Sequence, residues 1–191
     1  MHKKKREVII QPIGEIERDI LRYLKEELVD IFSFIDLVFK VNKNTMPLKE
    51  SEYNSSRQQY NGSKIMNRLL QKHYKTQPFR VLGVMDEDIY SGKLNFIFGI
   101  ATTPRKGVFN DYAAALISLV RLKEKYYGKE RNVDLFRQRA LKEAVHELGH
   151  NFGLNHCNNN CIMKFSNHLG QTDEKPIDFC KSCAGKLRKF I

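Results

Sequence analysis

The sequence predicts an α/β fold in which a twisted, largely parallel sheet is covered by helices. Short apolar runs that suit buried strands alternate along the chain with segments whose apolar residues recur every three or four positions, as in amphipathic helices. This alternation favours parallel strands that are joined by helical crossovers. The length of 191 residues suits one domain with a full hydrophobic core.

The first half of the chain supplies three expected strands and two expected helices. The strands are apolar runs at residues 8–12, 34–41 and 79–85. A turn at Ile13 and Gly14 leads into the first helix, at about residues 15–32, and the second helix spans about residues 63–74. The polar segment 42–59 contains Pro47 and is expected to form a long loop.

The second half begins with an acidic segment at residues 86–90, which reads either as a turn or as a cation or substrate contact. Residues 94–102 suit a strand, in which Gly99 indicates a bulge or a close approach by another backbone. Residues 113–122 fit a helix or a buried strand equally well. A further helix is expected from Asn132 or Asp134 to about Phe152.

That last helix carries the most informative motif of the chain. His146 and His150 are four residues apart, so on a helix their rings lie on one face and can converge on one metal ion. Glu147 lies beside them, within reach of a water molecule on that metal. Gly153 tolerates a positive φ and lets the chain turn back to bring in His156 as a third ligand. Three protein ligands leave a fourth tetrahedral position open, as in catalytic zinc sites.

The alternative is that these are merely the polar residues of an amphipathic helix. The apolar face of that helix is, however, already supplied by Leu141, Val145, Leu148 and Phe152. The fixed offsets of Gly153 and His156 also make the motif far more specific than the first five residues alone.

All four cysteines lie in the last 35 residues, as a C-x3-C pair and a C-x2-C pair: Cys157, Cys161, Cys180 and Cys183. Two closely spaced pairs can hold a structural zinc ion, which would secure a tail with few large apolar residues. Disulfides are the alternative and require an oxidising compartment. Cys157 follows His156 directly, so the two expected metal sites are neighbours, and the cysteine site would support His156 from behind.

The formal net charge is +11, which raises the question of nucleic acid. The basic residues are spread along the whole chain, so we expect a solvated surface and no nucleic-acid partner, although a positive field could favour acidic peptides. No apolar run is long enough to span a membrane. The first eleven residues lack the features of a secretory signal, and we expect a cytoplasmic protein.

The motif HExxHxxGxxH followed by a later methionine is the signature of the metzincin metallopeptidases. Cys157 after the third histidine, and the C-x-M at residues 161–163, resemble the archaemetzincin branch. Residues 82–90 and 94–101 also resemble that family, so the resemblance covers most of the chain from about residue 79 onward. In the family pattern, the spacer between the first two cysteines and the spacer between the methionine and the third cysteine are each one residue longer than in this chain. This departure affects only the local geometry of the loops, because all four cysteines are present.

The resemblance implies a zinc metallopeptidase with two zinc ions. His146, His150 and His156 would bind the catalytic zinc, Glu147 would be the general base and acid, and Met163 would form the Met-turn beneath the metal. It also implies a mixed, metzincin-like sheet in which residues 113–122 form a strand and residues 94–102 form an antiparallel edge strand that binds peptide or protein substrates. Residues 1–153 would form an N-terminal subdomain, and residues 154–191 a small zinc-stapled one.

Two other functions remain open. One is a zinc-containing module that binds peptide or nucleic acid and has a weak or vestigial histidine site. The other is an amide hydrolase that does not act on peptides. Residues 164–170 are expected to wall the substrate pocket, with His168 at the surface. The sequence does not specify the physiological substrate or the oligomeric state. It also does not specify whether the enzyme cleaves peptides internally or from one end.

Overall fold

The computed structural model describes residues 6–76, 78–103 and 113–190. Five strands form the main sheet in the order β2-β1-β5-β8-β7. Their bounds are β1 (Arg6–Ile13), β2 (Leu37–Val41), β5 (Arg80–Met85), β7 (Gly99–Ala101) and β8 (Ala113–Ser118). All neighbouring pairs are parallel except β7 and β8, which are antiparallel. The predicted α/β fold with an antiparallel edge strand is therefore confirmed.

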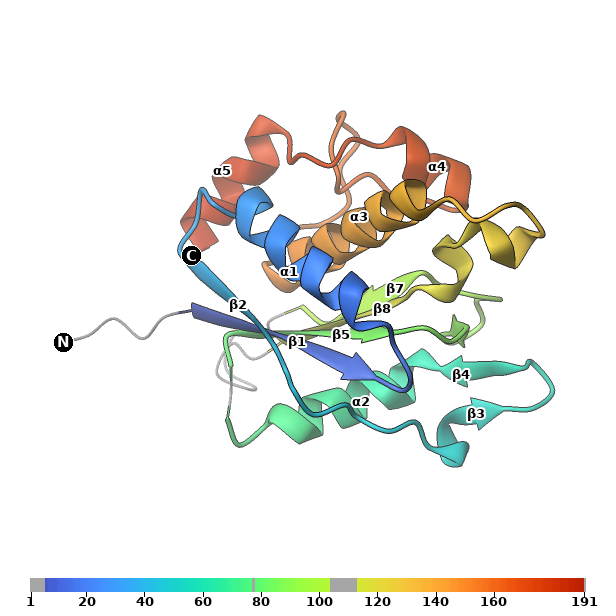
Figure 1. Cartoon of the computed structure of the whole chain (residues 1–191). Coiled ribbons are helices and arrows are strands. Elements are labelled where there is room, and N and C mark those ends of the chain that lie inside the picture. The colour runs from blue at the N-terminus through green and yellow to red at the C-terminus, as the bar shows by residue number, and fades with distance from the viewer. Residues whose placement is uncertain (1–5, 77, 104–112, 191) are drawn as a thin grey trace.

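Helices cover both faces of this sheet (Figure 1). The helices α1 (Arg18–Ile31) and α3 (Val133–Asn151) pack on one face, and α2 (Gly62–His73) packs on the other. The apolar stripe expected for the first helix faces the sheet, with Ile20, Leu21, Leu24 and Leu28 buried. In β5 and β8 all six residues are buried, as expected of central parallel strands that are covered on both faces.

The ends of α3 are defined by local chemistry. Asn132 is its N-cap, and the side-chain Oδ1 accepts a hydrogen bond from the Leu135 N–H at 3.0 Å. At the other end Gly153 has φ of +80°, and the N–H groups of Gly153 and Leu154 donate back into the last turn at 2.9 and 3.0 Å. The helix therefore begins and ends where its sequence predicts.

Three segments differ from their expected structure. The expected loop at residues 42–59 contains a 3-10 turn, η1 (Glu50–Glu52), and β3 (Tyr53–Asn54), and it reaches the start of β4 (Gln59–Asn61). With β6 (Ile89–Tyr90), β3 and β4 form a separate three-stranded sheet.

The expected strand at residues 94–102 is reduced to Gly99–Ala101. Arg57 and Gln59 donate side-chain hydrogen bonds to the carbonyls of Leu94 and Asn95, which a neighbouring strand would otherwise use. Residues 113–122 are a strand only as far as Ser118, and two 3-10 turns follow, η2 (Val120–Leu122) and η3 (Glu124–Tyr127).

The last part of the chain contains two helices that the sequence pattern did not reveal, α4 (Leu169–Glu174) and α5 (Lys181–Phe190). The ring of Phe190 packs 6.2 Å from that of Phe152, between ring centroids, so α5 lies against the end of α3. Within the described part of the chain, no helix combines the length and the apolar character needed to cross a membrane.

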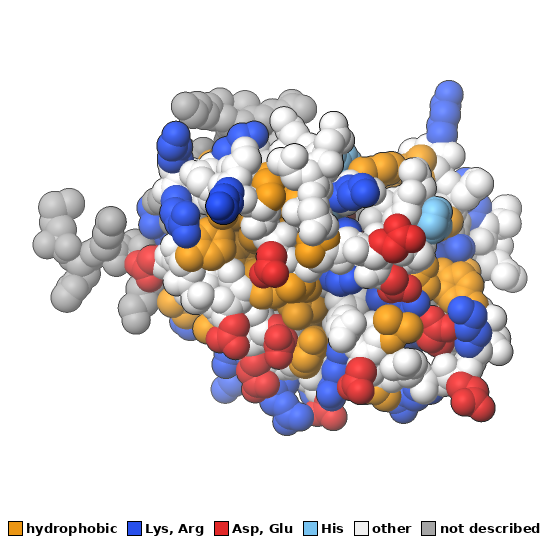
Figure 2. Space-filling model, turned by 90° about the horizontal axis from the view of Figure 1, so that it is seen from above, with side chains coloured by type: hydrophobic (Ala, Val, Ile, Leu, Met, Phe, Trp, Pro, Cys, Tyr) orange, Lys and Arg blue, Asp and Glu red, His pale blue; other side chains and the backbone are white. Residues whose placement is uncertain are grey.

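Figure 2 shows the face formed by the helices that lie above the sheet. Acidic and basic side chains occur side by side over much of this face, with apolar side chains between them. The charge distribution on this face matches the dispersed pattern expected from the sequence.

Candidate metal centres

Three histidines expected to bind metal converge at one place. His146 and His150 project from α3, and His156 comes from the turn that follows Gly153. One nitrogen atom of each ring lies within 4.8 Å of the other two. The structure therefore brings together the three side chains that the motif predicts as ligands.

Hydrogen bonds define the free nitrogen of two of these rings. The Nδ1 of His146 lies 2.9 Å from the carbonyl oxygen of Ile162, and the Nδ1 of His150 lies 2.8 Å from that of Leu154. A carbonyl oxygen can only accept, so each Nδ1 carries the hydrogen and each Nε2 presents a lone pair.

The two Nε2 atoms are 3.2 Å apart. Two lone pairs at this separation repel unless a cation lies between them. Tetrahedral zinc at about 2.0–2.1 Å from each nitrogen places two ligands about 3.3 Å apart. The donor set and its spacing therefore fit zinc.

The histidines are held in their neutral, ligating form. Burial, together with the nearby Lys175 ammonium, lowers the pKa of His146 to about 3. Burial also lowers the pKa of His150 and of His156, and Lys175 contributes in the same direction to both. A neutral imidazole binds metal without first releasing a proton.

Glu147 lies next to the triad but is not one of its clustered ligand atoms. The residue is 6% exposed, and burial raises the pKa of its carboxyl group well above the ordinary value, with a further increase from Glu143. The ammonium of Lys175 acts in the opposite direction. Glu147 is thus a carboxyl group in a desolvated site, of the kind that enzymes use for proton transfer.

The triad opens into a cavity of about 420 Å³. One wall is the segment that runs into the edge strand β7, including Phe98 and Gly99. The cavity is also lined by Phe165, Ser166 and Asn167, within the stretch 164–170 expected to wall it. His168 is exposed, as expected.

Residues 161–163 lie against α3 beside the triad. Met163 is fully buried and packs against the backbone of α3 at Gly149, where an added Cβ would collide with the Met163 sulfur. The Met163 carbonyl accepts a hydrogen bond from the Cys157 N–H at 2.9 Å. Gly149 is the part of this arrangement that the sequence analysis missed; its place one residue before His150 was the available signal.

The four cysteines form the second cluster, with sulfur atoms within 4.8 Å of one another. All four are free thiols, so no disulfide links them. The sulfurs of Cys157 and Cys180 are 3.8 Å apart, the spacing expected for tetrahedral zinc at about 2.3 Å from each sulfur. A hydrogen bond from the Cys183 backbone lowers the pKa of Cys180 to about 6, which favours a thiolate there, whereas burial raises the pKa of Cys161 and of Cys183.

A buried asparagine, which sequence reasoning also missed, ties this part of α3 to the sheet. The Asn151 Nδ2 donates to the carbonyls of Thr102 at 2.7 Å and Ala114 at 2.9 Å. The Asn151 carbonyl accepts from Arg80 Nε at 2.8 Å. These bonds fix the helix end, and therefore His150, against β7 and β8.

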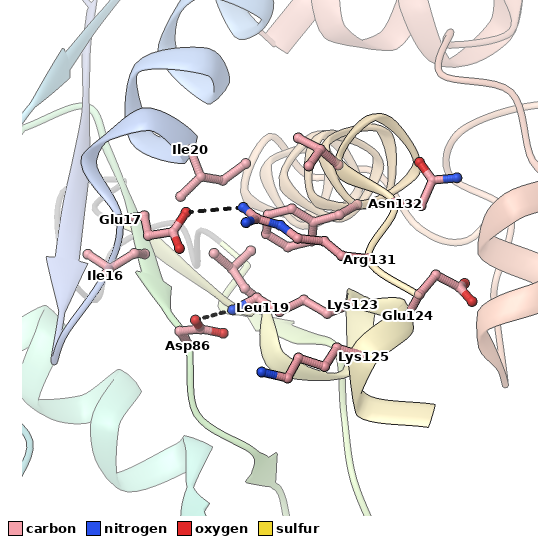
Figure 3. Close-up of a pocket in the computed structure, with 12 residues that line it drawn as sticks. Ile16, Glu17, Ile20, Asp86, Leu119, Lys123, Glu124, Lys125, Arg131 and Asn132 are labelled. Atoms are coloured by element: carbon pink, nitrogen blue, oxygen red, sulfur yellow. Dashed lines mark hydrogen bonds and ion pairs between the residues drawn. The ribbon is translucent and has the colours of Figure 1, made fainter. Parts of the chain in front are cut away.

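The acidic segment at residues 86–90 does not line the cavity of the triad. Asp88 forms a two-pronged ion pair with Arg121 at 2.6 and 2.7 Å, and Asp86 pairs with Lys123. Figure 3 shows Asp86 and Lys123 in a separate cavity of about 220 Å³, between the first turns of α1 and α3. These carboxylates join the strand ends to η2 and η3, which supports the turn interpretation.

Comparisons with known proteins agree with this geometry. The model of peptidase family M54 matches residues 6–189. An archaemetzincin of Methanocaldococcus jannaschii is 40% identical over 182 residues, which cover 95% of this chain and 92% of that protein. The similarity to the family therefore covers nearly the whole chain, whereas the motifs recognised in the sequence covered only the part from about residue 79 onward.

Solved structures share the fold. The crystal structure of archaemetzincin from Archaeoglobus fulgidus, complexed with malonate, has a TM-score of 0.74 and 34% identity, covering 94% of this chain and 99% of that one. A zinc-dependent peptidase from Methanocorpusculum labreanum has a TM-score of 0.81 and 26% identity, with the same coverage.

Fold, site and similarity together define a zinc metallopeptidase. Within that class, the chain belongs to the archaemetzincins, peptidase family M54.

Proposed function

We propose that this protein hydrolyses peptide bonds at the histidine triad, with Glu147 as the group that moves protons. The observation that carries the proposal is the pair of Nε2 lone pairs 3.2 Å apart, beside a buried carboxyl group that is not itself a ligand. His146, His150 and His156 would hold a catalytic zinc ion and leave one coordination position for water and substrate.

When bound, zinc supplies Lewis-acid chemistry, which lowers the pKa of a water molecule towards about 7 and withdraws charge from a substrate carbonyl. Glu147 accepts the proton of the attacking water and later gives it to the leaving amine. The raised pKa of the Glu147 carboxyl group suits the first step, because the carboxylate then takes up a proton more readily than an ordinary carboxylate does. Met163 supports the triad from below through its contact with α3.

The cysteine cluster would hold a second, structural zinc ion through Cys157, Cys161, Cys180 and Cys183. All four ligand positions would be filled by protein, which leaves none for substrate. We further propose that residues 154–191 form a small subdomain that this ion staples internally and that packs on residues 1–153. Buried Met163 and Leu187 belong to the same apolar core as α1 and α3, so the two parts share one interior.

The substrates would be peptides or proteins, as the family implies. The edge strand β7 pairs with β8 on one side only in the five-stranded sheet, and it borders the cavity. An extended peptide can add to such an edge through backbone hydrogen bonds, which would place its scissile bond over the triad.

The proposal is tested with zinc-loaded protein, a diverse peptide library and mass spectrometry of the products. We expect cleavage that a chelator abolishes. Glu147→Gln should lose cleavage while the zinc content stays at two per chain, because the glutamate is not a ligand. Equal turnover by this variant would remove Glu147 from the mechanism, and a library left intact by the loaded wild type would refute the peptidase proposal.

A further inference from the structure

A buried ion pair lines the same cavity as the histidine triad. The Lys175 Nζ lies 3.1 Å from Oε1 of Glu143, and the two side chains are 1% and 5% exposed. Both residues border the cavity beside His146 and Glu147. Glu143 lies one helical turn before Glu147 on α3, so the two carboxyl groups share one face of the helix.

The pair is fixed in place by the contact between α4 and α3. Thr172 donates its hydroxyl hydrogen to Glu143 Oε1 at 3.3 Å. Lys142 donates to the carbonyls of Thr172 and Asp173 at 3.0 and 2.7 Å, and Arg139 pairs with the Asp173 carboxylate at 2.6 and 2.7 Å. Because these bonds hold α4 against α3, Lys175 keeps its position relative to Glu143.

A third polar group faces the same cavity. The Ser166 hydroxyl oxygen is buried and has no hydrogen-bond partner among the residues that the structure describes. Ser166 lines the cavity together with Glu143 and Lys175. A buried hydroxyl without a partner costs free energy, which a ligand group in the cavity would recover.

We propose that this ion pair recognises the side chain of a substrate residue next to the scissile bond, and that it selects a carboxamide, glutamine or asparagine. The inference rests on the peptidase function proposed above and specifies the substrates of that site. A carboxamide has both an NH₂ group and a carbonyl oxygen. The NH₂ group would donate to the Glu143 carboxylate, and the carbonyl oxygen would accept from the Lys175 ammonium.

The charges of the pair explain why neutral side chains are preferred. A substrate carboxylate that enters the cavity is attracted by Lys175 but repelled by Glu143. A substrate ammonium group is attracted by Glu143 but repelled by Lys175. Neither charged side chain is compensated for the loss of its own hydration when it enters this buried site. An aliphatic side chain leaves the buried Ser166 hydroxyl without a partner and makes no hydrogen bond to the ion pair, which disfavours such substrates.

Peptides that contain a single variable residue in an alanine chain test the proposal. With the zinc-loaded wild type, we expect the peptide containing glutamine to be cleaved about tenfold or more faster than those containing glutamate, lysine or leucine, at a bond next to that residue. Binding of the same peptides to zinc-loaded Glu147→Gln, measured by calorimetry, should follow the same order. This second measurement does not depend on turnover.

Single neutralisations should shift the preference in opposite directions. Glu143→Gln leaves the Lys175 charge alone in the cavity and should favour the glutamate peptide. Lys175→Met leaves the Glu143 charge and should favour the lysine peptide. The double variant Glu143→Gln/Lys175→Met has no charge here and should fold even if a single variant does not. It should lose the discrimination between glutamine and leucine.

Lys186→Met is the control, since Lys186 is exposed on α5 and does not line the cavity. Its order of preference should equal that of the wild type. Preferential cleavage or binding of the leucine peptide by the wild type, or an unchanged order in the double variant, would overturn the inference. Either result could occur with full peptidase activity, so failure of the inference is distinct from failure of the proposed function.

Discussion

Glu147 occupies the space that a side chain at position 99 would need. A Cβ atom added to Gly99 would lie 2.6 Å from Cγ of Glu147 and 2.7 Å from its Oε1. The backbone of β7 therefore packs directly against this glutamate and limits its rotamers. The sequence predicts a bulge or a close approach by another backbone at Gly99, and the group that approaches is instead the Glu147 side chain.

Gly99→Ala should therefore reduce peptidase activity while leaving the metal bound. The added methyl group forces Glu147 out of position, and a displacement of about 1 Å can cost about a hundredfold in rate. The measurements are kcat on a cleaved peptide and zinc content. Gly185→Ala is the control, because an added Cβ there meets nothing within 4 Å. Normal kcat in Gly99→Ala would show that Glu147 does not depend on this contact.

Asn151→Ala should lower both stability and the affinity for metal at the triad. The substitution leaves the buried carbonyls of Thr102 and Ala114 without this donor, which costs about 2 to 4 kcal/mol in the free energy of unfolding. Urea denaturation and zinc titration measure the two effects. Asn132→Ala, at the other end of α3, should cost about 1 kcal/mol and leave zinc affinity unchanged. Equal losses in the two variants would contradict this role of Asn151.

His146 should remain neutral in acid when the triad holds no metal. Its pKa is lowered to about 3, whereas an unfolded histidine titrates near 6.5. The unfolded chain then binds more protons between these values, so the contribution of His146 to stability is complete above pH 6.5 and is lost as the pH falls towards 3. The raised pKa of the Glu147 carboxyl group acts in the opposite direction, because it lowers the free energy of unfolding as the pH rises above about 4.5. The substitution Glu147→Gln removes this contribution.

The test uses the Glu147→Gln variant loaded with one equivalent of cadmium. Cadmium is a soft cation that binds thiolates in preference to imidazoles, so it fills the cysteine cluster and leaves the triad without metal. Proton NMR should show no titration of the His146 ring between pH 8 and about pH 5. Urea denaturation should show that the free energy of unfolding decreases as the pH falls from about 6.5 to about 5. A titration midpoint near 6.5 would be inconsistent with the burial of this ring.

Cys180→Ser should release one zinc ion per chain and loosen the C-terminal segment. The serine hydroxyl does not replace the thiolate, whose low pKa suits it to metal. Limited proteolysis should then cut within residues 154–191, and metal analysis should give at most one zinc per chain. Cys180→Ser with full zinc content and wild-type protease resistance would argue against a structural site.

Sequence reasoning succeeded where local chemistry determines the structure. The length of α3 follows from the Asn132 cap and the positive φ of Gly153. The convergence of His146 and His150 follows from the period of the helix, and the buried strands β5 and β8 follow from their continuous apolar composition. Each of these features depends on a few neighbouring residues.

Other features depend on contacts between distant segments, which a single sequence does not encode locally. Arg57 shortens the strand near residue 94 by binding carbonyls 37 and 38 positions away. The partner of Lys175 is Glu143, 32 positions earlier, and the pair is visible only once α4 packs on α3. The strands β3, β4 and β6 have two or three residues each, too few for a periodic pattern.

His156 and Cys157 are adjacent residues that belong to different ligand clusters. Displacement of one by even a fraction of an ångström is transmitted through a planar peptide unit to the other. Coupling between two binding equilibria is reciprocal. If a zinc ion at the cysteines raises the affinity of the histidines for zinc, then a zinc ion at the histidines raises the affinity of the cysteines by the same factor. The two centres should consequently fill cooperatively, which would make the active form respond to zinc supply over a narrower concentration range than two independent sites would allow.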